Sequence, residues 1–555
     1  MVCQGGRRSG GERIMSAVPH PLLPRDVQDD YRRQGYWQDR TLADVMAEQV
    51  DRHPARLAVT GDHKLTYAEL WRDARRLACS LTEQGIRPGD FLVALLSSSW
   101  QGVVLELAAV VAGVAFVPRA ANLGPIGTAA LMDQLDARGL VLQGDLAGKA
   151  EWQRALPDFR RRLARRPLMM QGEVPAGSGF EDLPVLEAAC AGAAEMEPAA
   201  LDPGAPCLVL STGGTTGVPK SIVHCSNTLI YAGRMFGVGT EYRENDVQVS
   251  FAPYGHAGGS VFDIYMPLLY GAAILPITRW QPRPVAKEIA RHGGTIFITM
   301  GTHIFDLLNQ GPEVDELLKP VRLVTSGAGP DELYVNGERR FGFPIVRVYG
   351  CSEAPGHAIG RPSDTGEVRW HRDGVPFEGL EFRVVDVDTG EPVAPGQPGE
   401  YQVRGPNLFM GYHGQPELTA AAVTPDGFYR SGDLLTVTDD GYITWAGRTK
   451  DIIRRGGLQL DPIEMENILS SDPAIHEVVV VGEPHERLGE IAVIVAVAAP
   501  GFTPTLESLC GTLQAHGIAK QNLPEKLVLT TEIPRTGVGK FHRVEVKTRL
   551  VEDRL

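Results

Sequence analysis

The segment 210–220, LSTGGTTGVPK, constrains this chain more strongly than any other stretch of it. It combines glycines, hydroxyl side chains and Lys220, between an apolar run (207–210) and a helix that we expect to begin near Ser226. Glycines let the backbone turn its N–H groups toward an anion, while hydroxyls and a lysine add donors and positive charge. The segment therefore predicts a triphosphate-binding loop. It is not a Walker A loop, because the G-x-x-x-x-G-K-[ST] spacing is absent.

Length and charge narrow the class of protein. A chain of 555 residues is too long for one core and is expected to form two or more domains. The formal net charge of −14 argues against nucleic acid or an anionic membrane as the main partner, although a local basic cleft for ATP remains compatible with it. The apolar run 103–117 is short and contains Glu106, so we interpret it as a buried helix and strand, not as a membrane span.

The cysteines and the first residues indicate a cytoplasmic protein. Seven cysteines are scattered without C-x-x-C pairs, which disfavours a zinc site or a disulfide framework and fits a reducing compartment. Residues 1–14 are rich in glycine and arginine and contain no apolar run, so no secretory signal is expected. The sequence does not distinguish Met1 from Met15 as the start of translation. We expect residues 1–20 to be a disordered extension.

The order of patterns along the chain predicts an α/β fold. Helical and strand patterns alternate from about 40 to 120 and again from 208 to 370, which implies parallel sheets wrapped by helices. The poorly patterned stretch 144–198 is interpreted as a surface excursion before the phosphate loop. Residues 375–445 have β-rich patterns with Gly/Pro turns, and the last hundred residues suggest a separate small α+β domain.

Four further segments carry chemistry. In VYGCSEAPG (348–356) an apolar strand delivers Tyr349 and Glu353 at its carboxyl end, where ligands bind in open α/β sheets. The others are YRSGDLL (429–435), GYITWAGRTKDIIRRGGLQL (441–460) and PRTGVGKFHR (534–543). Together with the phosphate loop, in this order and covering residues 40–545, they resemble the adenylate-forming superfamily: acyl-CoA synthetases, aryl-acid AMP ligases, peptide-synthetase adenylation domains and luciferases.

The resemblance implies a domain arrangement and a set of roles. It implies a large adenylation domain (21–449), built from two α/β subdomains and a β-rich subdomain, and a small mobile domain (450–555) that rotates about Lys450. Lys540 would be the catalytic lysine that reaches the substrate carboxylate and the α-phosphate. Thr216 and Glu353 would act in catalysis and hold Mg²⁺, a hard cation that prefers oxygen ligands. Gly456 and Gly457 would lie against a pantetheine arm.

The same resemblance assigns binding residues. Asp433 would accept hydrogen bonds from the ribose hydroxyls, and Arg448 would contact ribose and phosphate. The complete set expected to bind ATP is Ser211, Thr212, Gly213, Gly214, Thr215, Thr216, Gly217, Lys220, Gly327, Ala328, Gly329, Tyr349, Gly350, Cys351, Ser352, Asp433, Ile443, Arg448 and Lys540. The set expected to bind the acid is His256, Ala257, Gly258, Gly327 and Ser352.

A few positions in the segments after the phosphate loop indicate which class of acid would bind. Amino-acid-activating relatives place an aspartate where this chain has Gly258, and Asp263 does not match that position, so an α-amino acid is disfavoured. Hydroxybenzoate-activating relatives carry His-Asn where this chain has His256-Ala257. Gly258, Gly259 and Gly327 are expected to leave room for a ring. We therefore predict an aromatic or cyclic acid without a requirement for an ortho-hydroxyl.

Two of the histidines near these segments, among His256, His303 and His357, are expected to be structural or to lie at the surface. One position departs from the family pattern. Relatives carry histidine six residues after the phosphate-loop lysine, whereas here that place is Ser226, with His224 two residues earlier. We interpret this as variation at a helix start, where serine is a good N-cap.

Several readings of function remain open at this point. The favoured one is an acid–CoA ligase, with ATP, Mg²⁺ and CoA, acting as a monomer or homodimer. A second is a stand-alone enzyme that loads a carrier protein in natural-product assembly. A third is a diverged member that activates another oxyanion, such as nitrite, for coupling to an amine. A catalytically dead interaction protein is disfavoured, because Glu353, Asp433, Arg448 and Lys540 are all present.

Overall fold

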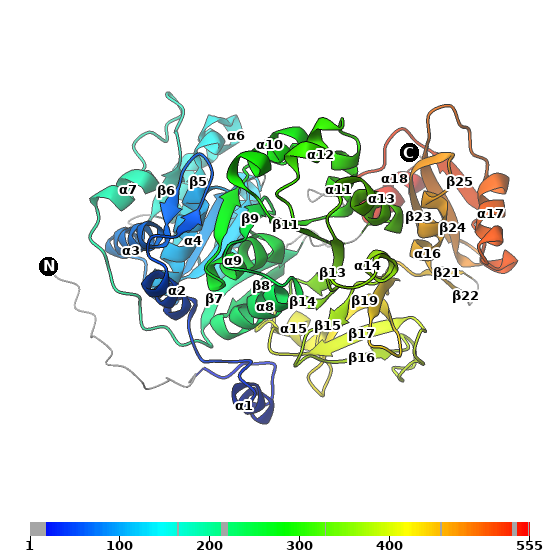
Figure 1. The fold of residues 1–555 in the computed structure, drawn as a ribbon, viewed down its shortest axis with the longest axis horizontal. Coiled ribbons are helices and arrows are strands. Elements are labelled where there is room, and N and C mark those ends of the chain that lie inside the picture. Colours follow the sequence, from blue (N-terminus) through cyan, green and yellow to red (C-terminus); the bar gives the residue numbers. More distant parts are fainter. Residues whose placement is uncertain are drawn as a thin grey trace.

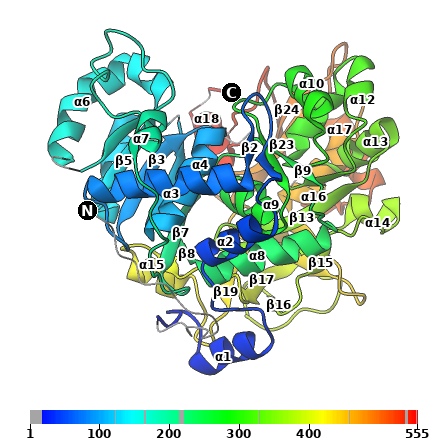
Figure 2. The same cartoon turned by 60° about the vertical axis from the view of Figure 1, so that its left-hand side comes forward.

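A computed structural model describes residues 18–121, 123–163, 166–212, 220–327, 329–455, 458–535, 541–552 and 554–555. Two large α/β layers stand next to each other, a smaller β-rich sheet lies beneath them, and the C-terminal domain lies at one end (Figure 1). Helix α1 (Arg25–Arg33) lies below the β-rich sheet in both views (Figure 2). The fold class predicted from the sequence, α/β with a smaller α+β domain, is confirmed.

The first layer is a mainly parallel sheet with the strand order β18-β8-β7-β4-β3-β5-β6. Its strands are β3 (Phe91–Leu96), β4 (Ala115–Ala120), β5 (Gly139–Gln143), β6 (Leu168–Gln171), β7 (Pro206–Thr212), β8 (Lys220–Cys225) and β18 (Gly411–Tyr412). Side chains alternate along β3. Leu92 and Ala94 join the core beneath α3 (Tyr67–Glu83) and α4 (Trp100–Ala112), whereas Val93 and Leu95 face α5 (Pro125–Leu135) and α6 (Ala150–Arg162). The apolar run 103–117 thus forms a buried helix and strand, as predicted.

The stretch 144–198 is built into this layer, so the expectation of a surface excursion is wrong. It contains η1 (Gly144–Gly148), α6, β6 and α7 (Leu186–Gly192). Trp152, Leu156 and Phe159 recur at helical spacing and are buried, and β6 pairs in parallel with β5. The many arginines of this stretch concealed that apolar stripe, because they occupy the exposed face of the same helix.

The second layer has the strand order β15-β14-β13-β12-β11-β9-β10-β1-β2 and is parallel from β13 to β1. Its strands are β1 (Leu57–Val59), β2 (Leu65–Thr66), β9 (Val247–Ser250), β10 (Ala273–Pro276), β11 (Ile296–Thr299), β12 (Leu323–Ser326), β13 (Ile345–Cys351), β14 (Ala354–Ile359) and β15 (Val375–Pro376). Its helices are α2 (Leu42–Arg52), α8 (Ser226–Gly239), η2 (Gly258–Tyr265), α9 (Met266–Leu269), α10 (Pro282–His292), α11 (Gly301–Leu308), α12 (Glu313–Leu317), α13 (Asp331–Phe341) and α14 (Gly366–His371).

The remaining two sheets are antiparallel in most of their pairings. The β-rich sheet has the order β16 (Glu381–Val385), β17 (Gly399–Arg404), β19 (Tyr429–Val437) and β20 (Ile443–Arg448), and α15 (Pro416–Ala421) precedes β19. The C-terminal elements are β21 (Ile453–Arg455), β22 (Leu458–Leu460), α16 (Pro462–Ser470), β23 (Ile475–His485), β24 (Gly489–Ala498), α17 (Leu506–Ala515), η3 (Lys520–Asn522), β25 (Lys526–Leu529) and α18 (Arg543–Val551). These elements bury their own apolar clusters on both faces of their sheet, as expected of a separate domain.

The start of the described chain is anchored to the β-rich region. The Nε2 atom of His20 lies 2.9 Å from the carbonyl oxygen of Leu408, and the indole N–H of Trp37 donates to the carbonyl of Pro406. His20 is buried, although it falls within the extension (1–20) expected to be disordered, and residues 1–17 lie outside the described residues. In the described parts of the chain, no helix is both long enough and apolar enough to cross a membrane.

Candidate active site

The ends of the predicted phosphate loop are fixed by an antiparallel strand pair. Ser211 pairs with Ser221 and Thr212 with Lys220, so β7 and β8 bring the two ends of the loop together. Gly255 lies at the same place: its carbonyl accepts the Ser211 N–H at 3.0 Å, and a Cβ on it would lie 2.8 Å from the carbonyl oxygen of Pro118. The loop positions Gly213, Gly214, Thr215, Thr216 and Gly217 lie outside the described residues, as does the side chain of Thr212.

A buried polar cluster lies beside this strand pair. The hydroxyl of Tyr412 donates a hydrogen bond to Oε1 of Glu353 at 2.8 Å, and Nζ of Lys220 lies 3.4 Å from the same hydroxyl. The ammonium of Lys220 is 4.6 Å from the centre of the Tyr412 ring, within the range of a cation–π contact. Burial and the charge of Glu353 raise the pKa of Tyr412, so its hydroxyl remains a donor. Two predicted residues from distant segments are thus joined by one tyrosine.

A second cluster brings together three predicted nucleotide-binding residues. The hydroxyl of Tyr349 donates to Oδ2 of Asp433 at 2.9 Å, and Nε of Arg448 lies 3.0 Å from Oδ1 of the same carboxylate. Asp433 and Arg448 are direct partners in the β19–β20 pairing, which sets their spacing. Burial alone would lower the pKa of Arg448, but the charges of Asp433 and Asp451 outweigh it and raise that pKa. This cluster can offer a carboxylate and a guanidinium to a ribose and a phosphate.

The turn after β13 is fixed by a hydrogen bond to a buried histidine, His224. Nε2 of His224 lies 2.7 Å from the carbonyl oxygen of Ser352, and burial lowers the pKa of His224 to about 4. The ring is therefore neutral at physiological pH and donates this hydrogen bond. A side chain at Gly350, near the end of β13, would collide with the backbone of Gly356 in β14, at 2.8 Å, so the close approach of these two strands requires glycine there. Ser226 begins α8, but the N-cap of this helix is Cys225, so our interpretation of Ser226 as the cap is wrong.

The predicted acid-binding segment forms the start of η2. His256 is exposed, and its Nδ1 accepts a hydrogen bond from the Gly258 N–H at 3.1 Å. A Cβ at Gly258 would lie 3.3 Å from that Nδ1, so only a small adjustment would be needed. A Cβ at Gly259 would lie 2.3 Å from the carbonyl oxygen of Pro253. Gly259 is therefore required by the backbone, and its expected part in leaving room for a ring stays a prediction.

Asp263 is bound to groups within the protein and is not accessible to a substrate ammonium. It is fully buried, it accepts hydrogen bonds from Nε2 of Gln248 at 2.9 Å and from the N–H of Ala252 at 3.2 Å, and burial raises its pKa well above the usual value. Ala257, the next residue after His256, is also buried. Asp263 thus braces η2 against β9, in agreement with the expectation that it does not bind an α-amino group.

Two glycines of the predicted site, Gly327 and Gly329, lie in the segment that follows β12. The Gly327 carbonyl accepts a hydrogen bond from the hydroxyl of Tyr334 at 2.7 Å, and a Cβ at Gly327 would lie 3.2 Å from Sδ of Met300. A Cβ at Gly329 would lie 2.9 Å from the same hydroxyl and 3.0 Å from the backbone of Gly301. Ala328 lies outside the described residues. Tyr334 therefore fixes the path of this segment.

The other two histidines make contacts within the protein, with His303 half-buried and His357 buried. Nδ1 of His303 accepts the Met300 N–H at 3.1 Å, and burial lowers its pKa to about 4. His357 is fully buried against Tyr349, its Nε2 lies 3.6 Å from Sγ of Cys351, and burial lowers its pKa to about 3. His303 and His357 thus make structural contacts, whereas His256 is exposed.

The predicted hinge follows directly on β20. Lys450 lies in a turn two residues after Arg448, and burial together with the positive charge of Arg448 lowers its pKa. Ile443 is fully buried at the opposite end of β20 from Arg448, so its predicted contact with the nucleotide stays a prediction. Gly456, Gly457 and Lys540 lie outside the described residues.

The residues present fit a divalent cation. Glu353 is 4% exposed, and its carboxylate meets the neutral hydroxyl of Tyr412, which leaves its negative charge available to an ion. The oxygen atoms of a triphosphate and of such a carboxylate are the kind of ligands that Mg²⁺ prefers. Sequence reasoning missed Tyr412 and the role of His224, because neither lies in one of the five segments. The only available signal was the tyrosine that ends the short apolar run 408–412.

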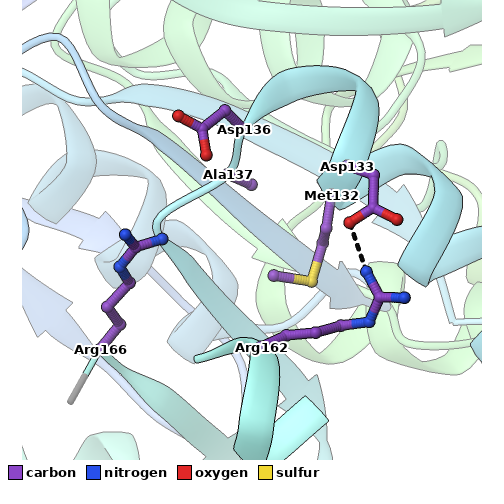
Figure 3. Close-up of a pocket in the computed structure, with 6 residues that line it drawn as sticks. All are labelled: Met132, Asp133, Asp136, Ala137, Arg162 and Arg166. Atoms are coloured by element: carbon purple, nitrogen blue, oxygen red, sulfur yellow. Dashed lines mark hydrogen bonds and ion pairs between the residues drawn. The ribbon is translucent and has the colours of Figure 1, made fainter. Parts of the chain in front are cut away.

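A cavity of about 220 Å³ lies beside two helices of the first layer (Figure 3). It is lined by the ends of α5 and α6, where Arg162 forms an ion pair with Asp133. The remaining lining residues are Met132, Asp136, Ala137 and Arg166. None of the predicted site residues lines it, so we assign it no part in the chemistry.

Comparisons with known proteins agree with this geometry. The profile of the AMP-binding enzyme family matches residues 46–413, and that of the AMP-binding enzyme C-terminal domain matches residues 464–540. The chain is 33% identical to the salicyl-AMP ligase / salicyl-S-ArCP synthetase of Mycobacterium tuberculosis, over 99% of this chain and 97% of that protein. It is 31% identical to the medium-chain fatty-acid–CoA ligase of Escherichia coli, over 94% of this chain and 93% of that protein.

A solved structure shows the same fold. ATP-bound MatB from Rhodopseudomonas palustris superimposes with a TM-score of 0.81 at 23% identity, covering 92% of this chain and all of that one. The family profiles and the two relatives confirm the predicted resemblance to adenylate-forming enzymes over nearly the whole chain. The protein is a ligase that adenylates an acyl or aryl acid, and it belongs to the AMP-binding enzyme family.

Proposed function

We propose that the protein uses ATP to convert an aromatic or cyclic carboxylic acid into an acyl-adenylate and then transfers the acyl group to the thiol of CoA. The observation that carries this proposal is the convergence of two polar clusters, Glu353–Tyr412–Lys220 and Tyr349–Asp433–Arg448. Glu353 and Tyr349 lie four residues apart in one segment, at the carboxyl end of β13, so the two clusters flank a single turn.

The first step brings two anions together. A carboxylate oxygen of the acid attacks the α-phosphorus of ATP, the bond from that phosphorus to the bridging oxygen breaks, and pyrophosphate leaves. Lys220, Arg448 and the predicted catalytic Lys540 offset the repulsion between the anions and stabilise the charge that develops at the α-phosphate. A Mg²⁺ ion held by Glu353 would neutralise part of the phosphate charge when it is bound. Asp433 would orient the ribose.

The choice of a ring acid rests on the start of η2. Gly258 places no side chain near His256, and Ala257 is small, so this end of the predicted pocket carries no carboxylate for an ammonium group. Salicylyl and benzoate ligases occur among the relatives, which supports an aromatic substrate. A fatty-acid ligase occurs as well, and the absence of asparagine at Ala257 argues against an obligatory ortho-hydroxyl.

The acceptor is the second part of the proposal. We favour CoA, because several relatives are named as CoA ligases. The salicyl-AMP ligase is also named as a salicyl-S-ArCP synthetase, so loading of a carrier protein is the alternative. Coupling of an activated oxyanion, such as nitrite, to an amine remains the third reading, since it would use the same activation residues.

The experiment is an end-point assay with the full chain, ATP and Mg²⁺, run over benzoates, cinnamates, alicyclic acids, short aliphatic acids, amino acids and nitrite. Mass spectrometry would follow acyl-AMP without a thiol and acyl-CoA with CoA. The proposal expects acyl-AMP from one class of ring acid and its conversion to acyl-CoA on addition of CoA. Acyl-AMP that persists with CoA would contradict CoA as the acceptor. Products from nitrite or amino acids alone would contradict the ring acid.

A further inference from the structure

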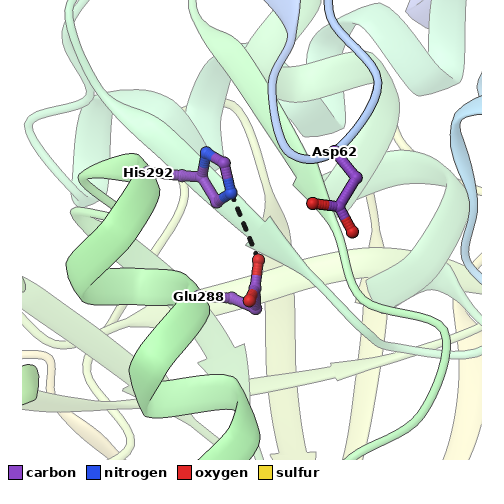
Figure 4. Close-up of side chains that lie close together, drawn as sticks. All are labelled: Asp62, Glu288 and His292. Atoms are coloured by element: carbon purple, nitrogen blue, oxygen red, sulfur yellow. Dashed lines mark ion pairs between the residues drawn. The ribbon is translucent and has the colours of Figure 1, made fainter.

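We propose that Asp62, Glu288 and His292 form a binding site for a divalent cation of the zinc class, remote from the adenylation residues (Figure 4). Asp62 lies in the turn between β1 and β2, and Glu288 and His292 lie four residues apart on α10. That spacing places both side chains on one face of the helix. One ligand atom from each of the three residues lies within 4.8 Å of the others.

His292 supplies the independent indication of a ligand. Its side chain is only 8% exposed, and its Nε2 is buried without a hydrogen-bond partner. Nε2 lies 3.2 Å from Oε2 of Glu288, at an orientation that does not satisfy a hydrogen bond. A buried polar atom without a partner costs free energy, and the lone pair of a neutral imidazole is satisfied by a metal ion. The ring nitrogen points toward both carboxylates (Figure 4).

The donor set selects the class of metal. One imidazole with two carboxylates suits Zn²⁺ and its neighbours in the transition series, whereas Mg²⁺ prefers oxygen ligands alone. Zinc bonds of about 2.0–2.2 Å require the three ligand atoms to draw together by roughly 1 Å. The exposed Asp62 side chain is free to make most of that movement, because 85% of its surface is accessible. A water molecule would complete the coordination.

The positively charged side chain of Arg291 limits the affinity of this site for a metal ion. The guanidinium of Arg291 lies 3.2 Å from Oδ1 of Asp62, and both side chains are exposed. Binding of a metal would have to break this ion pair, and the positive charge of Arg291 would repel the incoming ion. Bound metal would tie the β1–β2 turn to α10. The same turn carries His63, whose ring stacks on Trp100 at a centroid distance of 3.9 Å.

The test uses isothermal titration of the metal-stripped full chain with ZnCl₂, in a non-chelating buffer with a reductant and without nucleotide. The wild-type protein should show one saturable zinc site that His292→Gln and Asp62→Asn both lose, and that an excess of Mg²⁺ does not displace. Asp62→Asn changes an exposed turn residue, so it tests the site even if His292→Gln fails to fold. Arg291→Gln should bind zinc several-fold more tightly.

His371→Gln is the matched control. His371 also lies beside two carboxylates, Asp331 at 2.6 Å and Glu367 at 3.6 Å, but it meets them through opposite ring nitrogens, so they cannot share one ion. This variant should bind zinc as the wild type does. Zinc binding that is the same in Asp62→Asn and in the wild type, or no saturable binding in the wild type, would overturn the proposal. Activity in adenylation is not the readout, so the result is independent of the proposed function.

Discussion

The hydroxyl of Tyr412 donates a 2.8 Å hydrogen bond to the carboxylate of Glu353, across 59 positions of sequence. This contact fixes the position of one carboxylate oxygen. The same hydroxyl is within 3.4 Å of Lys220, at the end of the phosphate loop. Tyr412 therefore sets the distance between the predicted metal-binding carboxylate and the predicted phosphate-binding lysine.

Tyr412→Phe should weaken catalysis without removing the aromatic contact to Lys220. A hydrogen bond to a charged group contributes about 1.5–3 kcal/mol, which corresponds to a loss of about tenfold to a hundredfold in kcat/KM. The apparent requirement for Mg²⁺ should also shift to higher concentration. Steady-state kinetics over a Mg²⁺ series measures both effects. Tyr270→Phe, which loses a hydrogen bond to the Arg234 carbonyl, is the control. Equal kinetics in Tyr412→Phe and wild type would contradict a role for this contact.

Asp433→Asn should weaken the binding of ATP and leave the binding of the acid nearly unchanged. The substitution removes the negative charge that pairs with Arg448 and the acceptor expected to bind the ribose. We expect the KM for ATP to rise about tenfold or more, with little change in the KM for the acid. Asp426→Asn, an exposed aspartate paired with Arg383 near the β-rich sheet, should change neither value. A rise confined to the KM for the acid would show that Asp433 is misassigned.

Gly258 and Gly259 should differ sharply when each is changed to alanine. A Cβ at Gly259 would meet the Pro253 carbonyl at 2.3 Å, so Gly259→Ala should lower the melting temperature and the yield of folded protein. A Cβ at Gly258 would meet His256 at 3.3 Å, so Gly258→Ala should fold. It should raise the KM for ring acids more than for short aliphatic acids. Comparable losses with both kinds of acid would place Gly258 outside the acid pocket.

Glu106 gives the stability a defined pH dependence. Burial raises the pKa of this carboxyl to about 8, whereas in the unfolded chain it titrates near 4.5. Between these values the unfolded state releases the proton and the folded state keeps it, so stability falls as the pH rises, by about 1.4 kcal/mol per pH unit. Glu106→Gln has no ionisable side chain at this position, so its stability does not depend on this protonation. Its stability relative to wild type should therefore increase from pH 5 to pH 8 in denaturant titrations. A difference that does not vary with pH would contradict the buried neutral carboxyl.

The sequence predicted those parts of the structure that depend on local patterns. A buried strand does precede the phosphate loop, α8 does begin at Ser226, and Asp433 and Arg448 do lie together, although strand β8 between the loop and α8 was not predicted. The links between segments were not predictable, because Tyr412 and His224 act through contacts with residues distant in sequence. The stretch 144–198 was misjudged, since its arginines mask the stripe of Trp152, Leu156 and Phe159. The reason for Gly259 is visible only once the Pro253 carbonyl is placed.

The most direct test of the account is ATP–pyrophosphate exchange with the wild-type protein and Lys540→Ala, each with the ring acid that gives the strongest product. Losing a lysine that contacts the transition state costs on the order of 3–4 kcal/mol, so the variant should exchange at least about a hundredfold more slowly. Binding of ATP, measured separately, should be retained in the variant. Exchange that depends on the acid and is lost in Lys540→Ala is the predicted result. Exchange that is unaffected by the substitution, or that no carboxylic acid supports, would contradict the adenylation of a ring acid by this site.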